Sequence, residues 1–420
     1  MASVPRLGRR ALRGTAVALS AVLFWAVLSA GVGGAVGVPV SVRPPDAGSP
    51  LVRGVRGAGS GVPDPPSVTA DAAVLMDWRT GCVLFAKNAY RRRPPASTTK
   101  ILTAVVILEN ARLSEKVKVS RNAAWTPGSS MPLREGQVLT LGELLWGILL
   151  RSANNGCVAA AEHIAGSERA FVEMMNRRAA ELGARGTHFQ NSSGLHAPSH
   201  YTTAYDLAVI ARYALTIPAF EAIVRTRQAS LYVDGSEAEM RLRNTNSLLW
   251  TFAGAEGVKT GTTDQAGKCL VASATRDGRR LISVVLRSAD RYRDTEVLLE
   301  WGFRNYETVC LARARRPLAS APVTGGLVGE VALVPEQDLW VVCPAGTSED
   351  LEVEVDLARP LRAPVRKGQV VGVAEGVMGD ETVQAVNLLA ADDVPLWTPE
   401  RAFLRLFLRL FRFLAAHGVG

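Results

Sequence analysis

Three short polar strings, far apart in this 420-residue chain, constrain its fold more than any other feature. They are Ser97-Thr98-Thr99-Lys100, Ser152-Ala153-Asn154 and Lys259-Thr260-Gly261. The chain has seven lysines against forty-one arginines, yet two of the seven stand in these strings. Arginine would serve wherever only positive charge matters, whereas lysine can also lose its proton when it is desolvated. The strings therefore predict a fold that brings together an activatable hydroxyl, a hydroxyl–amide pair and a cationic strand.

The first string lies where a helix is expected to begin. Pro94-Pro95-Ala96 ends any preceding element, and Ser97 stands as an N-cap before the apolar run of residues 101–108. Lys100, three residues later, lies on the same face as Ser97. As a free base its amine can take the hydroxyl proton, provided that burial and neighbouring cations lower the lysine pKa. The ordinary alternative is an N-cap serine followed by a solvated lysine.

The second string, Ser152-Ala153-Asn154, lies between two apolar runs at residues 141–150 and 156–164. These runs predict two buried helices. Where two helices join, the backbone turns and polar side chains can point into a cleft. The ordinary alternative is a polar loop that is capped by Asn154.

The third string, Lys259-Thr260-Gly261, is followed by Thr262 and by two strand-like runs at residues 269–272 and 281–286. Asp277-Gly278 between these runs predicts a hairpin turn. A strand that contains glycine lets a ligand approach its backbone closely. Lys259 and Thr260 would then offer a charge and a hydroxyl to a carboxylate. The ordinary alternative is an edge strand without such a role.

These motifs resemble those of the low-molecular-mass penicillin-binding proteins, which are serine-type D-alanyl-D-alanine carboxypeptidases. The set S-x-x-K, S-x-N and K-T-G is typical of penicillin-binding proteins and of class A β-lactamases. Further segments similar to family blocks are Pro94–Lys100, Asn191–Leu195, His200–Leu207, Asn244–Asn246 and Leu361–Gly372. The resemblance covers about residues 68 to 415, and Ala153 stands where many relatives carry glycine.

The resemblance implies that a serine acyl-enzyme removes the terminal D-alanine from peptidoglycan pentapeptide stems and is blocked by β-lactam antibiotics. It implies catalytic roles for Ser97 as nucleophile, Lys100 as general base and Ser152 as proton relay to the leaving amine. The residues that it implies for substrate binding are Asn154, Lys259, Thr260, Gly261 and Thr262. The backbone N–H groups of Ser97 and Thr262 would form the oxyanion hole. The resemblance implies no metal and no organic cofactor.

Two other classes of protein share parts of this pattern. A β-lactamase would need a dedicated deacylating carboxylate, and after Asn154 no E-x-x-L-N string occurs, only Glu181-Leu182-Gly183 in a helical context. A non-catalytic cell-wall binding protein would usually lack a motif member, and none is missing here. We therefore favour the carboxypeptidase over both.

Composition excludes two further classes. The formal charge of +9 invites a nucleic-acid partner, but the arginines concentrate at the two ends and the interior has no basic run with interleaved aromatics. We therefore expect no nucleic-acid binding. The five cysteines have no metal-ligand spacing. The five histidines form no H-E-x-x-H string, which argues against a zinc peptidase. We expect His196 and His200 to be surface or supporting residues.

The order of elements predicts an α/β fold of the α+β kind. Strands are expected from Val68, helices dominate residues 97–217, and strands return at about residues 229–287. This order predicts the antiparallel sheet with a helical subdomain that β-lactamases and penicillin-binding proteins share, with the site in the cleft between them. We expect this catalytic domain over residues 68–315. Short alternating runs between Pro and Gly turns predict a small all-β domain over residues 318–395.

The N-terminus has the pattern of an exported protein. Arginines at positions 6, 9, 10 and 13 precede an apolar stretch from about Thr15 to Ala30. Residues 1–38 therefore predict a signal peptide or an N-terminal anchor. Residues 39–67 are rich in Pro, Gly and Val and predict a flexible linker.

The C-terminus predicts an amphipathic helix over residues 398–416. Arg401, Arg405, Arg409 and Arg412 fall within about 80° of one another on such a helix, and phenylalanines and leucines fill the rest. Arginines at mid-helix are costly in a membrane span. We therefore expect the helix to lie in the lipid interface, on the outer face of the cytoplasmic membrane of a bacterium. The alternative is a helix that packs on protein.

Overall fold

The computed structural model describes residues 64–232 and 239–416. One sheet has five strands in the order β2-β1-β9-β8-β7. These strands are β1 (Ala72–Asp77), β2 (Val83–Lys87), β7 (Ala255–Thr263), β8 (Gly267–Arg276) and β9 (Arg279–Ser288). β1 and β2 pair antiparallel. Asp277 and Gly278, between β8 and β9, have φ angles of 52° and 76°. Positive φ at both central residues is the conformation of a two-residue hairpin turn, so the predicted turn is confirmed.

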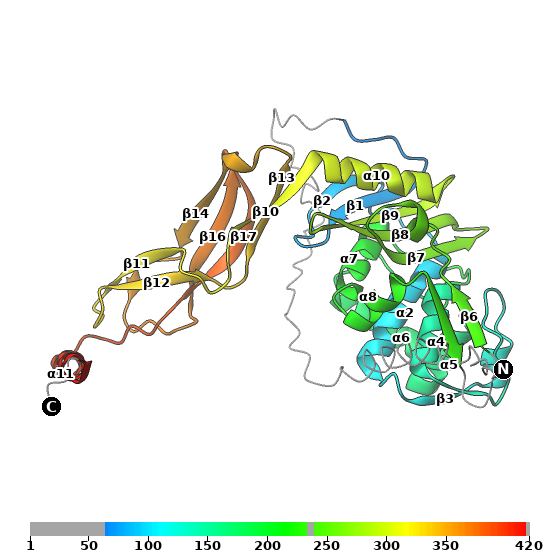
Figure 1. Ribbon diagram of the computed structural model, residues 1–420, viewed down its shortest axis with the longest axis horizontal. Coiled ribbons are helices and arrows are strands. Elements are labelled where there is room, and N and C mark those ends of the chain that lie inside the picture. Colours follow the sequence, from blue (N-terminus) through cyan, green and yellow to red (C-terminus); the bar gives the residue numbers. More distant parts are fainter. Residues whose placement is uncertain (1–63, 233–238, 417–420) are drawn as a thin grey trace, which may run out of the picture. The chain divides into compact units, whose positions relative to one another are not determined.

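The chain between β2 and β7 supplies the helices, which confirms the expected sheet with an inserted helical subdomain (Figure 1). Its helices are α2 (Lys100–Asn110), α3 (Arg121–Ala124), α4 (Leu141–Trp146), α5 (Asn154–Ala165), α6 (Glu168–Glu181), α7 (Ala204–Ala214), α8 (Pro218–Val224) and α9 (Leu248–Thr251). Two small antiparallel strand pairs lie among them, β3 (Lys116–Lys118) with β4 (Val138–Thr140) and β5 (Gln228–Tyr232) with β6 (Glu239–Arg243). The helix α2 is buried from Lys100 to Ile107 and packs against α5, α6, α7 and α8. Lys100 therefore begins a helix that is largely buried among other helices.

The join between the two predicted helices has a distinct backbone. The helix α4 begins at a capping box, in which Thr140 Oγ1 accepts from the Glu143 N–H at 3.1 Å and Glu143 Oε2 accepts from the Thr140 N–H at 2.6 Å. α4 continues into a π-helical turn, η3 (Gly147–Arg151). The chain leaves this turn at Ser152, whose φ is 65°, and α5 begins at Asn154. The left-handed residue ends one helix and allows the next to begin two residues later.

The helix α10 (Arg291–Asn305) follows the last strand of this sheet. It packs on the start of the sheet through Gly302, where a Cβ would lie 2.5 Å from Leu75 Cδ2 and 2.9 Å from Leu281 Cδ1. The Trp301 ring meets the Phe85 ring edge-on, with 6.4 Å between the ring centroids. Glycine at position 302 thus lets the helix approach the strands closely.

The remainder of the chain is rich in strands, as predicted. They are β10 (Tyr306–Ala312), β11 (Ala319–Thr324), β12 (Glu330–Pro335), β13 (Leu339–Pro344), β14 (Leu351–Leu357), β15 (Leu361–Arg362), β16 (Val370–Met378) and β17 (Glu381–Ala390). Six of them form a sheet in the order β14-β16-β17-β12-β11-β15, and β10 pairs with β13. A single buried cluster that includes Val331, Leu333, Val341 and Leu388 forms their core. β10 lies before this six-stranded sheet in the chain and pairs antiparallel with β13.

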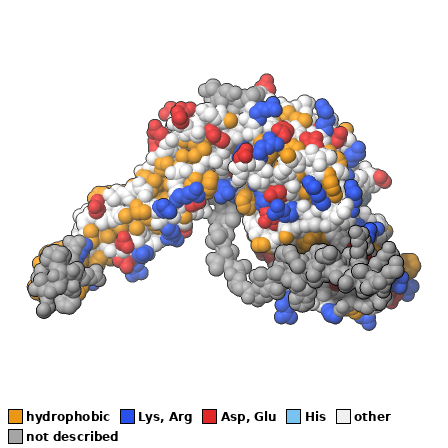
Figure 2. Space-filling model, in the orientation of Figure 1, with side chains coloured by type: hydrophobic (Ala, Val, Ile, Leu, Met, Phe, Trp, Pro, Cys, Tyr) orange, Lys and Arg blue, Asp and Glu red, His pale blue; other side chains and the backbone are white. Residues whose placement is uncertain are grey.

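By density of contacts the chain divides into two units, and the division runs through β8 and β9. Among the described residues, the first unit contains 88–232, 239–272 and 284–292, and the second contains 64–87, 273–283 and 293–416. Charged side chains of both signs are interspersed over the face in Figure 2. The predicted signal or anchor segment, residues 1–38, lies outside the described residues.

The predicted C-terminal helix is present as α11 (Pro399–Ala416). Its described side chains include Phe403 and Leu406, which are 71% and 68% exposed. Arg405 Nη1 donates to the Leu327 carbonyl at 3.0 Å. Over the described part of the chain, no single helix has both the length and the apolar composition to cross a membrane, and only α7 with α8, joined at a bend of 111°, meet that criterion as a pair.

Candidate active site

Ser97 lies on a short 3-10 turn, η2 (Ala96–Thr99), directly before α2. The prediction that Ser97 caps the helix is wrong, because the cap positions of η2 and α2 are Pro95 and Thr99. The Ser97 hydroxyl instead accepts a hydrogen bond from Lys100 Nζ at 2.9 Å. In a 3-10 turn, side chains three residues apart lie directly above one another. The predicted pairing of Ser97 with Lys100 on one face is therefore confirmed.

The backbone just before Ser97 is held in an uncommon conformation. Ala96 is 1% exposed and has a φ of 48°. A left-handed conformation costs a non-glycine residue about 1–2 kcal/mol and persists only where the surroundings fix it. Thr98 Oγ1 donates to the Pro95 carbonyl at 2.7 Å, and Thr99 Oγ1 donates to the Ala96 carbonyl at 2.9 Å. The two threonines of the motif thus fix the turn that presents Ser97.

His200 supports the same turn from the loop between α6 and α7. It is buried, and the Gln190 N–H donates to its Nδ1 at 3.1 Å. Nε2 therefore carries the proton and donates to Thr99 Oγ1 at 2.9 Å. Burial, with smaller contributions from the charges of nearby histidines and Lys100, lowers the pKa of His200 to about 3. A neutral His200 is thus part of the support of the turn, and sequence reasoning gave it no more specific role.

Lys100 is fully buried, and its ammonium has three acceptors. Nζ donates to Ser97 Oγ at 2.9 Å, to Asn154 Oδ1 at 2.8 Å and to the Ser193 carbonyl at 2.5 Å. Burial lowers the pKa of Lys100 from 10.5 to about 8, and Cys157 opposes this shift. A lysine with such a pKa provides a measurable fraction of free amine near neutral pH. The sequence analysis required that burial lower the pKa of Lys100 if this lysine is to act as a base. The structure provides that burial.

The two polar residues of the second motif, Ser152 and Asn154, differ in their hydrogen bonds. Asn154 is 4% exposed, accepts from Lys100 through Oδ1 and donates through Nδ2 to the Pro127 carbonyl at 2.7 Å. Its contact with Lys100 was not predicted from the sequence. Ser152 is 5% exposed, and its hydroxyl makes no hydrogen bond with any residue of the ranges 64–232 and 239–416. Asn154 therefore forms a hydrogen bond with Lys100, whereas Ser152 does not.

The third motif lies on β7, at an edge of the five-stranded sheet. Lys259 is 1% exposed, and its Nζ donates to the Thr260 carbonyl at 3.3 Å. Thr260 Oγ1 shares a hydrogen bond with Thr245 Oγ1 at 2.7 Å. Burial, and after it the charge of Lys100, lowers the pKa of Lys259 well below its ordinary value. A bound anion would favour the charged form of this lysine again, so the site is suited to a carboxylate.

Two glycines let the parts of the site approach one another. A Cβ at Gly261 would lie 2.9 Å from the Ser97 backbone nitrogen and 3.0 Å from the Pro95 carbonyl oxygen. A Cβ at Gly194, whose φ is 88°, would overlap the Ala96 carbonyl. Any side chain at these positions would displace the turn, so both glycines are required by close backbone approach.

Arg291, the first residue of α10, adds a cation that the sequence reasoning missed. Its Nη1 donates to Thr262 Oγ1 at 2.9 Å, to the Gly261 carbonyl at 3.0 Å and to the Cys269 carbonyl at 3.3 Å. It is one of forty-one arginines and belongs to no motif. Its position at the start of a helix could have drawn attention to it. The first turn of a helix ordinarily favours acidic side chains, so a basic residue there is unusual.

Within the described residues the structure contains no group of three or more His, Cys, Asp or Glu side chains that could hold a metal ion. The five cysteines are free thiols. The groups that can act chemically in this site are the Ser97 hydroxyl with the adjacent Lys100 amine, and the side chains of Lys259 and Arg291. Such a site can form an ester on a serine from a substrate that carries a carboxylate.

Comparison with known proteins agrees with this geometry. The family model described as D-alanyl-D-alanine carboxypeptidase matches residues 60–290, which is more than half of the chain. The chain belongs to the D-alanyl-D-alanine carboxypeptidase family. A second model, for the C-terminal domain of penicillin-binding protein 5, matches residues 306–396. Both the family and the enzyme class that the sequence motifs predicted, a serine-type D-alanyl-D-alanine carboxypeptidase, are thus confirmed.

Individual relatives support the same family. The D-alanyl-D-alanine carboxypeptidase DacF of Bacillus subtilis is 36% identical over 334 residues, which cover 77% of this chain and 86% of the relative. The D-alanyl-D-alanine carboxypeptidase DacA of Escherichia coli K12 is 35% identical over 351 residues, or 80% of this chain and 86% of the relative. The structure of penicillin-binding protein 5 from Haemophilus influenzae matches with a TM-score of 0.72 at 32% identity and covers 79% of this chain and 99% of that chain. This carboxypeptidase is therefore similar to its relatives over both the catalytic and the C-terminal β regions.

Proposed function

We propose that Ser97 is the nucleophile of this carboxypeptidase and that Lys100 is its general base. The observation that carries the proposal is the 2.9 Å hydrogen bond between Lys100 Nζ and Ser97 Oγ, combined with a lysine pKa lowered to about 8 by burial. A neutral amine at that distance is within reach of the hydroxyl proton. The hydrogen bonds to Asn154 and the Ser193 carbonyl hold the amine in this orientation.

In the proposed reaction, Ser97 Oγ attacks the carbonyl carbon of the peptide bond between two D-alanines while Lys100 takes the hydroxyl proton. The backbone N–H groups of Ser97 and Thr262 hold the resulting oxyanion. The C–N bond then breaks, and Ser152 relays a proton to the amine of the departing D-alanine. Water finally cleaves the acyl ester, which releases the shortened peptide and restores the Ser97 hydroxyl.

The remaining predicted residues bind the substrate in this proposal. Lys259 and the hydroxyls of Thr260 and Thr262 hold the terminal carboxylate, and Arg291 contributes a second positive charge beside Thr262. Asn154 binds a backbone amide of the peptide. Gly261 keeps the space between β7 and the Ser97 turn open. The substrates are peptidoglycan pentapeptide stems, and β-lactam antibiotics acylate the same hydroxyl.

The test is Ser97→Ala, assayed by release of D-alanine from a muropeptide ending in D-Ala-D-Ala and by covalent labelling with a fluorescent penicillin. We expect both signals to disappear, because one hydroxyl serves both acylations. Ser199→Ala is the matched control, since this serine is exposed and its side chain lies outside the site. Stoichiometric labelling of a folded Ser97→Ala protein would contradict the proposal.

We further propose that the enzyme is exported by way of residues 1–38 and works outside the cytoplasmic membrane. The catalytic domain then comprises residues 68–315, and the β domain, residues 318–395, follows it. Helix α11 holds the protein at the membrane surface, with Phe403 and Leu406, both largely exposed, toward the lipid. Arginines on such a helix add attraction to anionic lipid of roughly 1 kcal/mol for each charge near the surface.

Removal of residues 398–420 tests this location. We expect the truncated protein to lose binding to vesicles that contain anionic lipid, while its rate of D-alanine release in solution stays the same. Replacing Arg401 and Arg405 by glutamate should weaken the binding in a salt-dependent way. Unchanged vesicle binding after truncation would mean that α11 packs on protein instead.

A further inference from the structure

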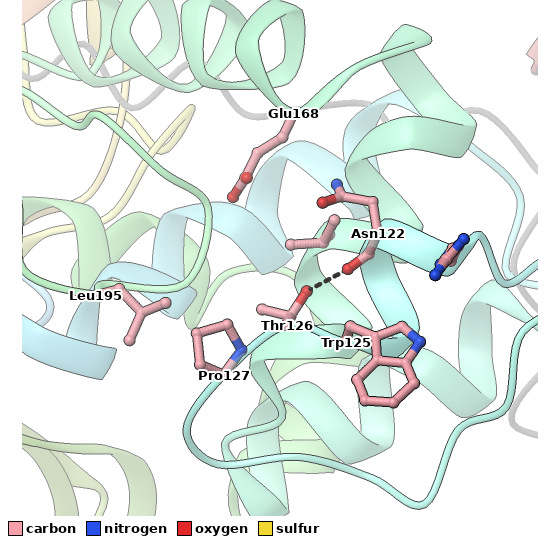
Figure 3. A pocket seen from close by; sticks show the side chains of 8 residues that line it. Asn122, Trp125, Thr126, Pro127, Glu168 and Leu195 are labelled. Atoms are coloured by element: carbon pink, nitrogen blue, oxygen red, sulfur yellow. Dashed lines mark hydrogen bonds between the residues drawn. The ribbon is translucent and has the colours of Figure 1, made fainter.

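Two motifs of the site are held by residues that lie outside the motifs. The Pro127 carbonyl accepts from Asn154 Nδ2 at 2.7 Å, and Pro127 lies in the wall of the cavity drawn in Figure 3. In the third motif, Thr260 Oγ1 lies 2.7 Å from Thr245 Oγ1. Thr245 belongs to the segment between β6 and α9, and it has so far been given no role. Its contacts indicate a part in substrate recognition.

The backbone around Thr245 is fixed by hydrogen bonds. The Thr245 N–H donates to the Leu150 carbonyl at 3.1 Å, in the turn that leads to Ser152. Asn244 Oδ1 accepts from the Asn246 N–H at 3.0 Å, which closes the backbone around Thr245. Asn244 and Asn246 are 4% and 0% exposed, whereas Thr245 between them is exposed. The backbone therefore fixes the point from which the Thr245 side chain reaches β7.

The start of helix α10 holds the same segment. Tyr292, the second residue of α10, donates through its hydroxyl to the Thr245 carbonyl at 3.1 Å and accepts from the Ser247 N–H at 3.3 Å. Arg291, the first residue of α10, donates to Thr262 Oγ1 at 2.9 Å. All of these residues belong to the first unit. The start of α10 therefore contacts both β7, at Thr262, and the segment that carries Thr245.

The hydroxyls of Thr260 and Thr262 can each donate one hydrogen to a bound carboxylate, because a carboxylate only accepts. These threonines stand two residues apart on β7, so their side chains lie on one face of the strand. Thr262 Oγ1 already accepts from Arg291, which leaves the Thr262 hydrogen for a ligand. Neither Thr245 Oγ1 nor Thr260 Oγ1 has another hydrogen-bond partner among residues 64–232 and 239–416. Thr260 therefore keeps its hydrogen for a ligand only when Thr245 is the donor in the bond that they share.

We propose that Thr245 is a positioning residue for recognition of the substrate carboxylate, and that Tyr292 fixes Thr245 for this task. When the terminal carboxylate binds, it accepts from Thr260 Oγ1. Thr260 Oγ1 in turn accepts from Thr245 Oγ1, so both hydrogens point along the chain toward the carboxylate. Hydrogen bonds aligned in this way polarise and strengthen one another. The inference rests on the proposed function, because Thr260 is the residue that is proposed to bind the carboxylate.

Thr245→Val tests the proposal, because valine keeps the shape of the side chain and removes the hydroxyl. The substrates are a peptide ending in D-Ala-D-Ala and the methyl ester of the same peptide, and their cleavage is followed by chromatography. We expect kcat/KM for the acid to fall about three- to tenfold, the range of one hydrogen bond. The value for the ester should fall by less than about twofold, because an uncharged ester is a weaker acceptor than a carboxylate.

Two further variants accompany this measurement. Thr245→Ser keeps the hydroxyl, so it should restore most of the kcat/KM for the acid that Thr245→Val loses. Thr216→Val is the matched control, because Thr216 is an exposed threonine after α7, outside the site, whose hydroxyl donates to the Tyr213 carbonyl. It should change kcat/KM for neither substrate.

A double-mutant cycle separates positioning of Thr260 from a direct contact between Thr245 and the substrate. If Thr245 acts through Thr260, adding Thr245→Val to Thr260→Val should lower kcat/KM for the acid by less than about twofold more. Tyr292→Phe should lower it about two- to threefold, because both bonds of the Tyr292 hydroxyl are lost. Equal losses for acid and ester in Thr245→Val, or full additivity in the double variant, would overturn the inference and leave the proposed function intact. Failure of the wild type to cleave the acid peptide would instead refute the proposed function, and the inference with it.

Discussion

The lowered pKa of Lys100 makes the pH dependence of acylation a direct test of its role as base. Burial brings this pKa to about 8. The free amine then amounts to about 1% at pH 6, about a tenth at pH 7 and about nine-tenths at pH 9. If the free amine takes the Ser97 proton, the rate of acylation follows these fractions. It should increase about tenfold for each pH unit below 8 and level off above it.

The measurement is the second-order rate constant for labelling by a fluorescent penicillin at concentrations far below saturation. Under that condition the pH profile reports the pKa values of the free enzyme. Lys100→Arg keeps a positive charge but holds its proton, so the rate should fall by about 10²–10⁴, the range expected when a general base is lost. Lys118→Arg is the matched control, because Lys118 is an exposed lysine on β3.

Two results would refute this reasoning. A labelling rate that stays constant between pH 6 and pH 9 would show that no group with a pKa near 8 accepts the proton. A Lys100→Arg protein that acylates at close to the wild-type rate would show that the lysine acts only as a fixed charge. Either result would move the search for the base to another residue.

Three further predictions concern other parts of the site. Lys259→Ala should reduce the transition-state stabilisation of acylation by about 2–4 kcal/mol for substrates with a free carboxylate, which is the scale of a lost charge-assisted contact in a closed site. Equal losses for the acid and its methyl ester would contradict a carboxylate-binding role. Gly261→Ala should lower the penicillin labelling rate by about ten- to a hundredfold, because its Cβ would lie 2.9 Å from the Ser97 nitrogen. Gly329→Ala is the control and should not change the rate, because a Cβ at Gly329 has no neighbour within 4 Å. The pKa of His200 is about 3 in the folded protein and 6.5 in the unfolded chain. Between pH 3 and pH 6.5 the unfolded state therefore binds more protons than the folded state, so the free energy of unfolding decreases as pH falls. Between pH 7 and pH 5 the wild type should therefore lose about 2 kcal/mol more than His200→Gln in denaturant titrations, and an equal loss in both proteins would show that His200 is already protonated when folded.

The sequence predicted the parts of the fold that depend on local pattern. Apolar runs on both sides of Ser152 indicated two helices, and Asp277-Gly278 indicated a hairpin, because these signals act over a few residues. The pairing of Ser97 with Lys100 followed from a spacing of three. In each case the deciding interaction lies within one turn or one hairpin of the chain.

What the sequence did not predict depends on contacts between distant segments. Arg291 contacts Thr262 because α10 begins beside β7, and no spacing in the chain encodes that proximity. The capping role expected for Ser97 was wrong, because its hydroxyl is bonded to a buried amine and not to a free backbone N–H. Asn154 was expected to bind substrate, and its bond to Lys100 follows only from the packing of α2 against α5.

The burial of Lys259 also links ligand binding to protons in solution. Its pKa is held well below the ordinary value by burial and by the charge of Lys100. A carboxylate that binds beside it favours the ammonium form and so raises the pKa of Lys259 again. By linkage, a group that gains a proton on binding makes the affinity for the anion decrease as pH rises. We therefore expect the affinity of this enzyme for a carboxylate substrate to depend on pH over the range in which Lys259 titrates.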